Sequence, residues 1–377
     1  MRTAICARFG VEFPLFAFSH RRDVVAAVTN AGGLGVLGAV GYSADRLEAE
    51  LSWIDAQVGG RPYGVDVLVP GRIDAAAAGP GTRLADLVPE RHRDFVSHLF
   101  AKYGVSGGEP YGGGPVTQPA EFGHRITGEG ATGLVEVALK HPVALVAAAL
   151  GPPPPELVAL ARRAGVPVAA LVGTVEHARR QVAAGADLIV AQGGEAGGHT
   201  GEISTMVLVP QVVDAVDVPV LAAGGIASGR QMAAAMALGA EGVWCGSVWL
   251  TTEEAETPPV VVRKLLAATS RDTTRSPCRT GKPARQLTSA WTEEWDDATE
   301  SPGPLPMPWQ ALLAEGAMSR IIRSAESGDE GALRLASHFV GQVVGQLNEV
   351  KPVRRVVHEI MEEFAGAAER LRRISAG

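Results

Sequence analysis

Cysteine is scarce in this chain of 377 residues, and its copies lie far apart. Cys6, Cys245 and Cys278 form no closely spaced pair, which argues against a disulfide scaffold and against a cysteine-based zinc site. We expect free thiols. No apolar run reaches the roughly 18 residues that a transmembrane helix needs, and the first residues lack the apolar core of a signal peptide. These absences make the cytoplasm the expected location.

Charge of one sign does not accumulate along the chain either. The formal net charge is −7 and the basic residues form no long run, so neither a nucleic acid nor a membrane is an expected partner. No cluster of His, Asp and Glu has the spacing of metal ligands, and no metal is expected. Lysine is rare, and none ends a predicted strand, which disfavours a Schiff-base mechanism. The lysines are Lys102, Lys140, Lys264, Lys282 and Lys351.

Short apolar runs are what the chain has in abundance, and they alternate with longer amphipathic segments as in successive βα units. Most runs are continuously apolar, which is typical of parallel strands buried on both faces. Eight runs predict an α/β fold, a TIM (β/α)₈ barrel. An open doubly wound sheet fits less well, because no dinucleotide pattern follows the first strand. The expected strands are Pro14–Phe18, Gly35–Ala39, Tyr63–Val69, Val143–Ala149, Val166–Val172, Leu188–Gln192, Val218–Ala223 and Gly242–Val248.

Two regions interrupt this rhythm. Residues 71 to about 141 form a long insertion after the third strand, rich in glycine and proline at its centre, and loops of this length are usually functional or mobile. A polar, proline-rich stretch follows the eighth strand and leads into helical patterns. The sequence therefore predicts a barrel over residues 1–255 and a helical appendage over residues 256–377, packed beside the barrel mouth.

The seventh and eighth strands both end in glycine. Gly224 and Gly225 follow the seventh strand, where Ser228 is expected to cap a helix, and Gly246 and Ser247 follow the eighth. Glycine lets a ligand approach the backbone closely, and a helix N-terminus favours an anion. Two such turns match the usual phosphate site of barrel enzymes. A non-redox isomerase or lyase acting on a phosphate compound would show the same pattern.

A glycine-rich turn with a single histidine follows the sixth strand. Gln192 ends the strand, and the turn continues Gly-Gly-Glu-Ala-Gly-Gly to His199. Its small side chains leave room for a flat ring against the backbone while His199 projects into the mouth. Imidazole has an ordinary pKa near ~6.5 and can take a proton from an acidic carbon at neutral pH. Because barrel enzymes carry their catalytic groups at this end of the strands, His199 is the candidate base.

Several segments closely resemble the nitronate monooxygenases, formerly called 2-nitropropane dioxygenases. They are Gly193–His199, Ala222–Ile226 and Leu238–Ser247, together with Asn30–Gly35 and the Gly341-Gln342 pair. The resemblance runs in the right order over most of residues 10–250. As a set, these motifs are specific for the superfamily.

The resemblance implies non-covalent FMN and a role for each matching residue. The phosphate would be held by Gly224, Gly225, Gly246 and Ser247. The ring would lie near Gln192, Gly197 and Gly198, against Ala17 and Phe18 of the first strand, with His199 as catalytic base. The implied reaction converts a nitronate or nitroalkane and O2 into a carbonyl compound and nitrite. FMN would carry the redox chemistry, while the protein orients it and supplies the base.

The first strand departs from the family pattern and leaves the substrate open. Family members commonly carry Pro-Ile-x-Gln-Ala-Pro-Met there, whereas this chain reads Pro-Leu-Phe-Ala-Phe-Ser-His, ending at His20. His20 is either a substrate contact or an exposed cap residue. An FMN-dependent reductase of an enone or enoyl thioester, using NAD(P)H in place of O2, is the second interpretation. A flavin-binding protein without turnover and a homodimer formed through the C-terminal helices also stay open.

Overall fold

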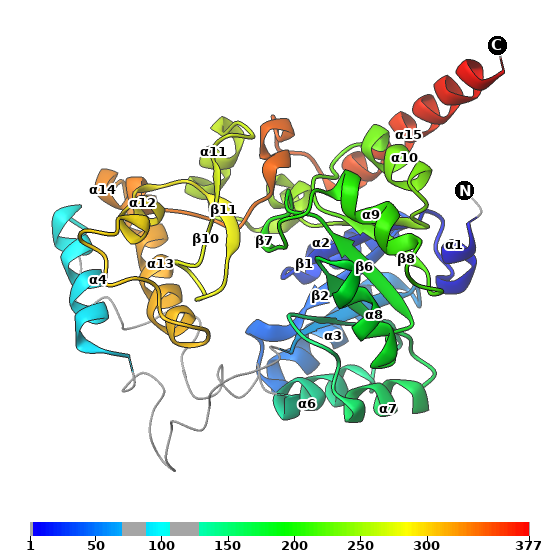
Figure 1. Ribbon diagram of the computed structural model, residues 1–377, viewed down its shortest axis with the longest axis horizontal. Helices are drawn as coiled ribbons and strands as arrows, with labels where there is room; N and C mark the ends of the chain where they lie inside the picture. Colours follow the sequence, from blue (N-terminus) through cyan, green and yellow to red (C-terminus); the bar gives the residue numbers. More distant parts are fainter. Residues whose placement is uncertain (1–2, 70–87, 106–127, 377) are drawn as a thin grey trace.

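The computed structural model describes residues 3–69, 88–105 and 128–376, and in it eight parallel strands close into a barrel (Figure 1). The predicted TIM barrel is confirmed. Seven strands lie within two residues of their expected bounds, and the last ends early because the 3-10 helix η4 (Ser247–Thr251) begins there. In order around the barrel the strands are β1 (Leu15–Ser19), β2 (Leu34–Gly38), β3 (Tyr63–Leu68), β4 (Val143–Ala149), β5 (Val168–Val172), β6 (Leu188–Gln192), β8 (Val220–Ala223) and β9 (Gly242–Cys245).

Side chains alternate between the inside of the barrel and the surrounding helices, as they must along a strand. Phe16 and Trp244 fill the interior, with ring centroids 6.3 Å apart. Gly165, Gly185 and Gly239 follow their helices in the left-handed conformation, which confirms them as helix stops. The helices around the wall are α1 (Ala4–Phe9), α2 (Arg22–Asn30), α3 (Ala44–Val58), α6 (Gly128–Ala138), α7 (Pro155–Arg163), α8 (Val175–Ala183), α9 (Thr205–Val213) and α10 (Gly229–Ala237).

A second lobe lies beside the barrel, built mostly from the chain after β9 (Figure 1). The insertion contributes α4 (Glu90–Lys102) to this lobe, because the Phe95 ring lies 4.9 Å from Trp295 and the Tyr103 hydroxyl donates a 2.6 Å hydrogen bond to Glu294. Trp295 is fully buried, as a core anchor should be. The other elements of the lobe are α11 (Pro259–Ala267), β10 (Thr273–Ser276), β11 (Ala284–Leu287), α12 (Ala290–Asp296), α13 (Trp309–Glu326) and α14 (Glu330–Leu335).

The second lobe is not purely helical, which differs from the sequence prediction. Strands β10 and β11 pair antiparallel, and β11 also pairs with β7 (Gly198–His199) of the barrel loop. Ala284 lies opposite His199 in this small sheet. The lobe is therefore bonded through its backbone to the turn that carries the candidate base.

The last helix also differs from the expected position beside the mouth. α15 (Val353–Ser375) packs against α10 and α2 on the outer wall of the barrel, and its end projects from the body (Figure 1). Gly229 permits this contact, since a Cβ there would lie 2.0 Å from the Ile360 carbonyl oxygen. Over residues 3–69, 88–105 and 128–376, no helix has the length and apolar content to span a bilayer.

Candidate active site

The two glycine turns of the predicted phosphate site are neighbours in space. Ala223 of β8 pairs with Trp244 of β9, so the residues that follow them meet at the carboxyl end of the barrel. Gly224 and Gly225 both take positive φ, at 93° and 71°, which a side chain would strain. A Cβ built at Gly246 would have no atom of the described residues within 4 Å, apart from its own chain neighbours. The end of β9 thus offers backbone beside open space, while the Gly224-Gly225 turn packs on the loop after β6.

A third segment, from near the C-terminus, closes against these turns. The Gly341 N–H donates a 2.8 Å hydrogen bond to Ser247 Oγ, which leaves the hydroxyl proton of Ser247 for a ligand. Gly197 packs so tightly here that a Cβ on it would lie 2.8 Å from the Gly341 nitrogen. Gln342 donates its N–H to the Glu195 carbonyl at 2.9 Å. The structure therefore brings Gly197, Ser247 and the Gly341-Gln342 pair together.

The N-terminus of α10 does not serve as expected. Ser228 does cap the helix, accepting the Gln231 N–H. The Gly229 N–H, however, donates to the Glu363 carboxylate of α15 at 3.1 Å, and the Ala227 N–H donates to the Gln231 side chain at 2.9 Å. A carboxylate already complements the helix dipole. Two N–H groups at the start of α10 are therefore already bonded within the protein, and the glycine turns carry the prediction of a phosphate site.

Aromatic side chains and a histidine line the β1 side of the mouth. Phe18 faces the barrel interior and stacks on Trp244 at 6.4 Å. Ala17 points the other way, into the core between barrel and helices, so only its backbone can reach a ligand. His20 follows β1, and its Nδ1 donates to the Gly38 carbonyl at 3.1 Å, so Nε2 carries the lone pair of the neutral ring. Desolvation by the surrounding protein lowers the pKa of His20, although the residue keeps an exposed surface.

Asp66 is a site residue that the sequence argument missed. It lies opposite Gly38 on β3, where Val65 and Val67 face the outer helices, so its carboxyl faces the barrel interior. The side chain is buried, and Oδ2 has no hydrogen-bond partner among the described residues. Burial raises the pKa of Asp66 well above its ordinary value, which favours the protonated carboxyl, a hydrogen-bond donor. A lone acid in the apolar run Tyr63–Leu68 was the available signal.

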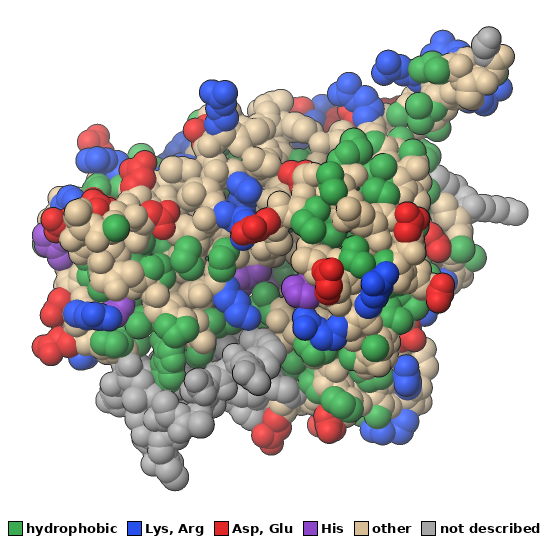
Figure 2. All heavy atoms as spheres, in the orientation of Figure 1, with side chains coloured by type: hydrophobic (Ala, Val, Ile, Leu, Met, Phe, Trp, Pro, Cys, Tyr) green, Lys and Arg blue, Asp and Glu red, His purple; other side chains and the backbone are tan. Residues whose placement is uncertain are grey.

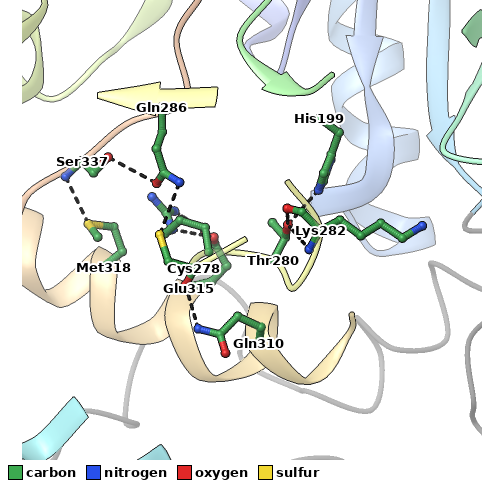
Figure 3. A network of polar contacts seen from close by, with 10 residues as sticks. His199, Cys278, Thr280, Lys282, Gln286, Gln310, Glu315, Met318 and Ser337 are labelled. Carbon is green, nitrogen blue, oxygen red and sulfur yellow. Dashed lines mark hydrogen bonds and ion pairs between the residues drawn. The ribbon is translucent and has the colours of Figure 1, made fainter. Parts of the chain in front are cut away.

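His199 sits where the barrel loop meets the second lobe, with its ring turned toward Thr280 (Figure 3). Its Nε2 lies 2.8 Å from Thr280 Oγ1. Burial, followed by the positive charge of Lys282, lowers the pKa of His199 to about 4. At neutral pH the ring is therefore uncharged. Glu195, in the same loop, accepts the Thr205 N–H at 2.9 Å and caps α9, which is a structural role.

The second lobe contributes further polar groups opposite the barrel. Arg279 forms a bidentate ion pair with Glu315, at 2.8 and 2.9 Å. Burial and the charge of Arg279 lower the pKa of His338 to about 4, and His20 is a further cause. Figure 2 shows histidine and basic side chains along the boundary between the two halves of the molecule. The mouth thus holds His199 and His338, whose pKa values leave them uncharged at pH 7, and His20, whose pKa is also lowered. His338 gave no sequence signal.

These residues fit a flavin mononucleotide. The open backbone at Gly246 suits a phosphate, and the Ser247 hydroxyl, which accepts the Gly341 N–H, has its own proton to donate to one. Asp66 Oδ2, which has no hydrogen-bond partner among the described residues, suits a polar ring atom at the floor of the mouth. Gln192 ends β6 next to Ala223 and borders the same space. Within the described ranges no group of three or more His, Cys, Asp or Glu has an arrangement for a metal ion.

Comparison with known proteins agrees with this architecture. The family model described as nitronate monooxygenase matches residues 5–363. The chain belongs to the nitronate monooxygenase family. It is 57% identical over 367 residues to a Mycobacterium tuberculosis protein named "Putative monooxygenase Rv1533", with 97% of this chain and 96% of that protein covered.

Two solved structures cover nearly the whole chain. The nitroalkane oxidase of Streptomyces ansochromogenes superposes with a TM-score of 0.77 at 30% identity, over 96% of this chain and 98% of that one. FabK of Thermotoga maritima gives 0.69 at 28% identity, over 99% of both chains. As a member of the nitronate monooxygenase family, the protein is a flavin oxidoreductase. The non-redox isomerase or lyase considered from the sequence is therefore set aside.

Proposed function

We propose that this family member is an FMN-dependent enzyme that oxidises nitronates, and less readily nitroalkanes, with O2 to a carbonyl compound and nitrite. The observation that carries the proposal is the neutral His199 in the loop that packs on Gly224 and Gly225, within the field of Lys282. The similarity to a nitroalkane oxidase at a TM-score of 0.77 supports it.

Each group at the mouth has a task in this proposal. Gly224, Gly225, Gly246 and Ser247 would hold the phosphate of FMN, and Gln192, Phe18 and Asp66 would border its ring. FMN would accept electrons from the substrate and pass them to O2. The barrel and the second lobe, which includes α4 of the insertion, would hold the substrate between them.

The electrostatics favour a substrate that arrives as an anion. A base whose conjugate acid has a pKa of about 4 holds protons weakly, so His199 is a slow acceptor for the proton of a neutral nitroalkane. The ammonium group of Lys282, which helps to lower that pKa, attracts a nitronate. We therefore expect a higher kcat/KM for a propyl nitronate than for the corresponding nitropropane.

Replacement of His199 by Ala tests the proposal, with nitrite formation as the assay. Loss of a general base typically costs 10²- to 10⁴-fold, so nitropropane turnover should fall by about that factor. Turnover of the nitronate, which needs no proton removal, should fall much less. His98→Ala, a change on α4 of the second lobe, is the matched control and should leave both substrates unaffected. An equal fall in the turnover of both substrates would show that His199 does not act in proton transfer.

The second candidate is an FMN-dependent NAD(P)H reductase of an enone or enoyl thioester. The similarity to FabK over 99% of both chains favours it. The two candidates share the flavin site and differ in where the electrons come from and go. Mixing the flavin-loaded protein anaerobically with NADH or NADPH decides between them, because only the reductase would bleach the flavin absorbance with a nicotinamide alone.

A further inference from the structure

Among the described residues of the second lobe, only Thr280 forms a hydrogen bond with the His199 ring. The other hydrogen bond of the Thr280 hydroxyl shows which of the two residues is the donor. Thr280 Oγ1 lies 3.0 Å from the Lys282 carbonyl oxygen, which can only accept. The single hydroxyl proton therefore points to that carbonyl, since two oxygens so close without a proton between them would repel. Oγ1 is then an acceptor toward His199.

The protonation of the imidazole follows from this assignment. His199 Nε2 must carry a hydrogen in order to donate to Oγ1 at 2.8 Å. The ring is neutral at pH 7, because burial and Lys282 lower the pKa of His199 to about 4. A neutral imidazole has one N–H, so the lone pair resides on Nδ1. No described residue hydrogen-bonds to Nδ1.

We propose that Thr280 is a positioning residue that holds His199 as the Nε2–H tautomer, so that Nδ1 is the atom that accepts the substrate proton. The proposal rests on the proposed function and names the reacting atom of its base. In the proton-transfer step, the C–H bond of the nitroalkane breaks and its electron pair stays with the substrate as the nitronate. A new N–H bond forms at Nδ1, and the resulting imidazolium is held by Thr280 on its other side.

The turn that carries Thr280 is braced on several sides, as a positioning role requires (Figure 3). Gln310 donates to the Cys278 carbonyl at 2.7 Å, and the adjacent Arg279 pairs with Glu315. Gly281 has a φ of 83°, and a Cβ there would lie 2.3 Å from the Leu305 carbonyl oxygen, so the turn packs directly on backbone. These contacts hold the hydroxyl in place without help from His199.

The histidine is held from its own side as well. β7 pairs with β11, which sets the His199 backbone opposite Ala284, only four residues beyond Thr280. The sheet therefore fixes the backbone of His199, and Thr280 lies in the connection between the two other strands, β10 and β11. His20 shows the opposite arrangement, since its Nδ1 donates to Gly38 and leaves the lone pair on Nε2. His20 therefore serves as an internal reference with the opposite tautomer in the same spectrum.

Nitrogen NMR of the flavin-free protein, labelled with ring-¹⁵N histidine at pH 7, tests the proposal without turnover. The His199 signals are assigned from their loss in His199→Gln. The wild type should show a protonated Nε2 and an unprotonated Nδ1 at His199, with the reverse at His20. Thr280→Val, which keeps the shape and removes the hydroxyl, should shift His199 toward a mixture of tautomers, and Thr280→Ser should restore the wild-type pattern. A protonated Nδ1 in the wild type would overturn the proposal even if a variant failed to fold.

Kinetics on two substrates then separate this proposal from the function on which it rests. In Thr280→Val, kcat/KM for nitropropane should fall about three- to tenfold, the effect of one neutral hydrogen bond, and kcat/KM for the nitronate by less than twofold. Thr280→Ser should recover the nitropropane rate. An unchanged nitropropane rate in Thr280→Val would refute the positioning role. If the wild-type protein turned over neither substrate, the proposed function would fail. The nitrogen NMR spectrum would still test whether Thr280 sets the tautomer of His199.

Discussion

Replacing Gly246 by Ala separates ligand binding from folding at the centre of the candidate site. The backbone at Gly246 has negative φ, at −120°, and apart from its chain neighbours no described residue has an atom within 4 Å of a Cβ built there. The free energy of unfolding of the flavin-free protein should therefore change by no more than about 0.5 kcal/mol. The same methyl group would occupy the space that the phosphate needs.

The expected loss of affinity follows from the contacts that the methyl group displaces. A hydrogen bond to a charged group contributes about 1.5–3 kcal/mol, and about 1.4 kcal/mol corresponds to a factor of ten. Displacing the phosphate from one backbone N–H should thus raise the Kd for FMN roughly 10- to 100-fold. Quenching of flavin fluorescence on titration with protein measures this Kd.

Two other glycines serve as comparisons. Gly133→Ala in α6, where a Cβ also meets open space, should leave the Kd unchanged. Gly225→Ala should lower the free energy of unfolding by about 1–2 kcal/mol, because its φ of 71° is left-handed. A stable Gly246→Ala protein that binds FMN like the wild type would show that the phosphate does not lie at the end of β9.

Three further changes probe the surroundings of the site. Glu363→Ala removes the carboxylate that accepts the Gly229 N–H. The free energy of unfolding, measured by urea denaturation, should fall by about 1 kcal/mol, and the Kd for FMN should not change. A tenfold change in this Kd would show that the start of α10 does contribute to FMN binding. Asp66→Asn should raise the unfolding free energy of the flavin-free protein at pH 7 by about 1–3 kcal/mol. Because burial raises the pKa of Asp66, ionisation of its carboxyl opposes folding as pH rises. The stability gained by Asp66→Asn should therefore vanish near pH 4. The same pH dependence of the unfolding free energy in wild type and variant would refute this reasoning. Trp295→Ala should cost about 3–5 kcal/mol, since Phe95 of the insertion loses its partner, and a loss below 1 kcal/mol would mean that α4 is not anchored there.

The barrel could be predicted from the sequence because its signals are local. A continuously apolar run such as Val143–Ala149 specifies a buried parallel strand, and its bounds are those of β4. The glycines that stop helices are likewise set by the backbone of their own turn, as at Gly165. The two glycine turns followed, because neighbouring parallel strands must end side by side.

The missing parts depend on contacts between distant segments. Thr280 lies 81 residues after His199, and Glu363 lies 134 residues after Gly229. No sequence pattern near either pair indicates the contact. The hydrogen bond of His199 to Thr280 and that of the Gly229 N–H to Glu363 could therefore not be predicted. β7 is only two residues long and exists because β11 pairs with it. Asp66 differs, since a lone carboxyl in an apolar strand was visible and was passed over.

An anaerobic absorbance measurement on the FMN-loaded protein tests the central claim most directly. The protein is mixed with a propyl nitronate and, separately, with NADH or NADPH. The proposed function predicts rapid loss of the flavin band with the nitronate alone and recovery of the band, with formation of nitrite, when O2 is admitted. Bleaching by a nicotinamide and not by the nitronate would contradict the claim and assign the site to a reductase.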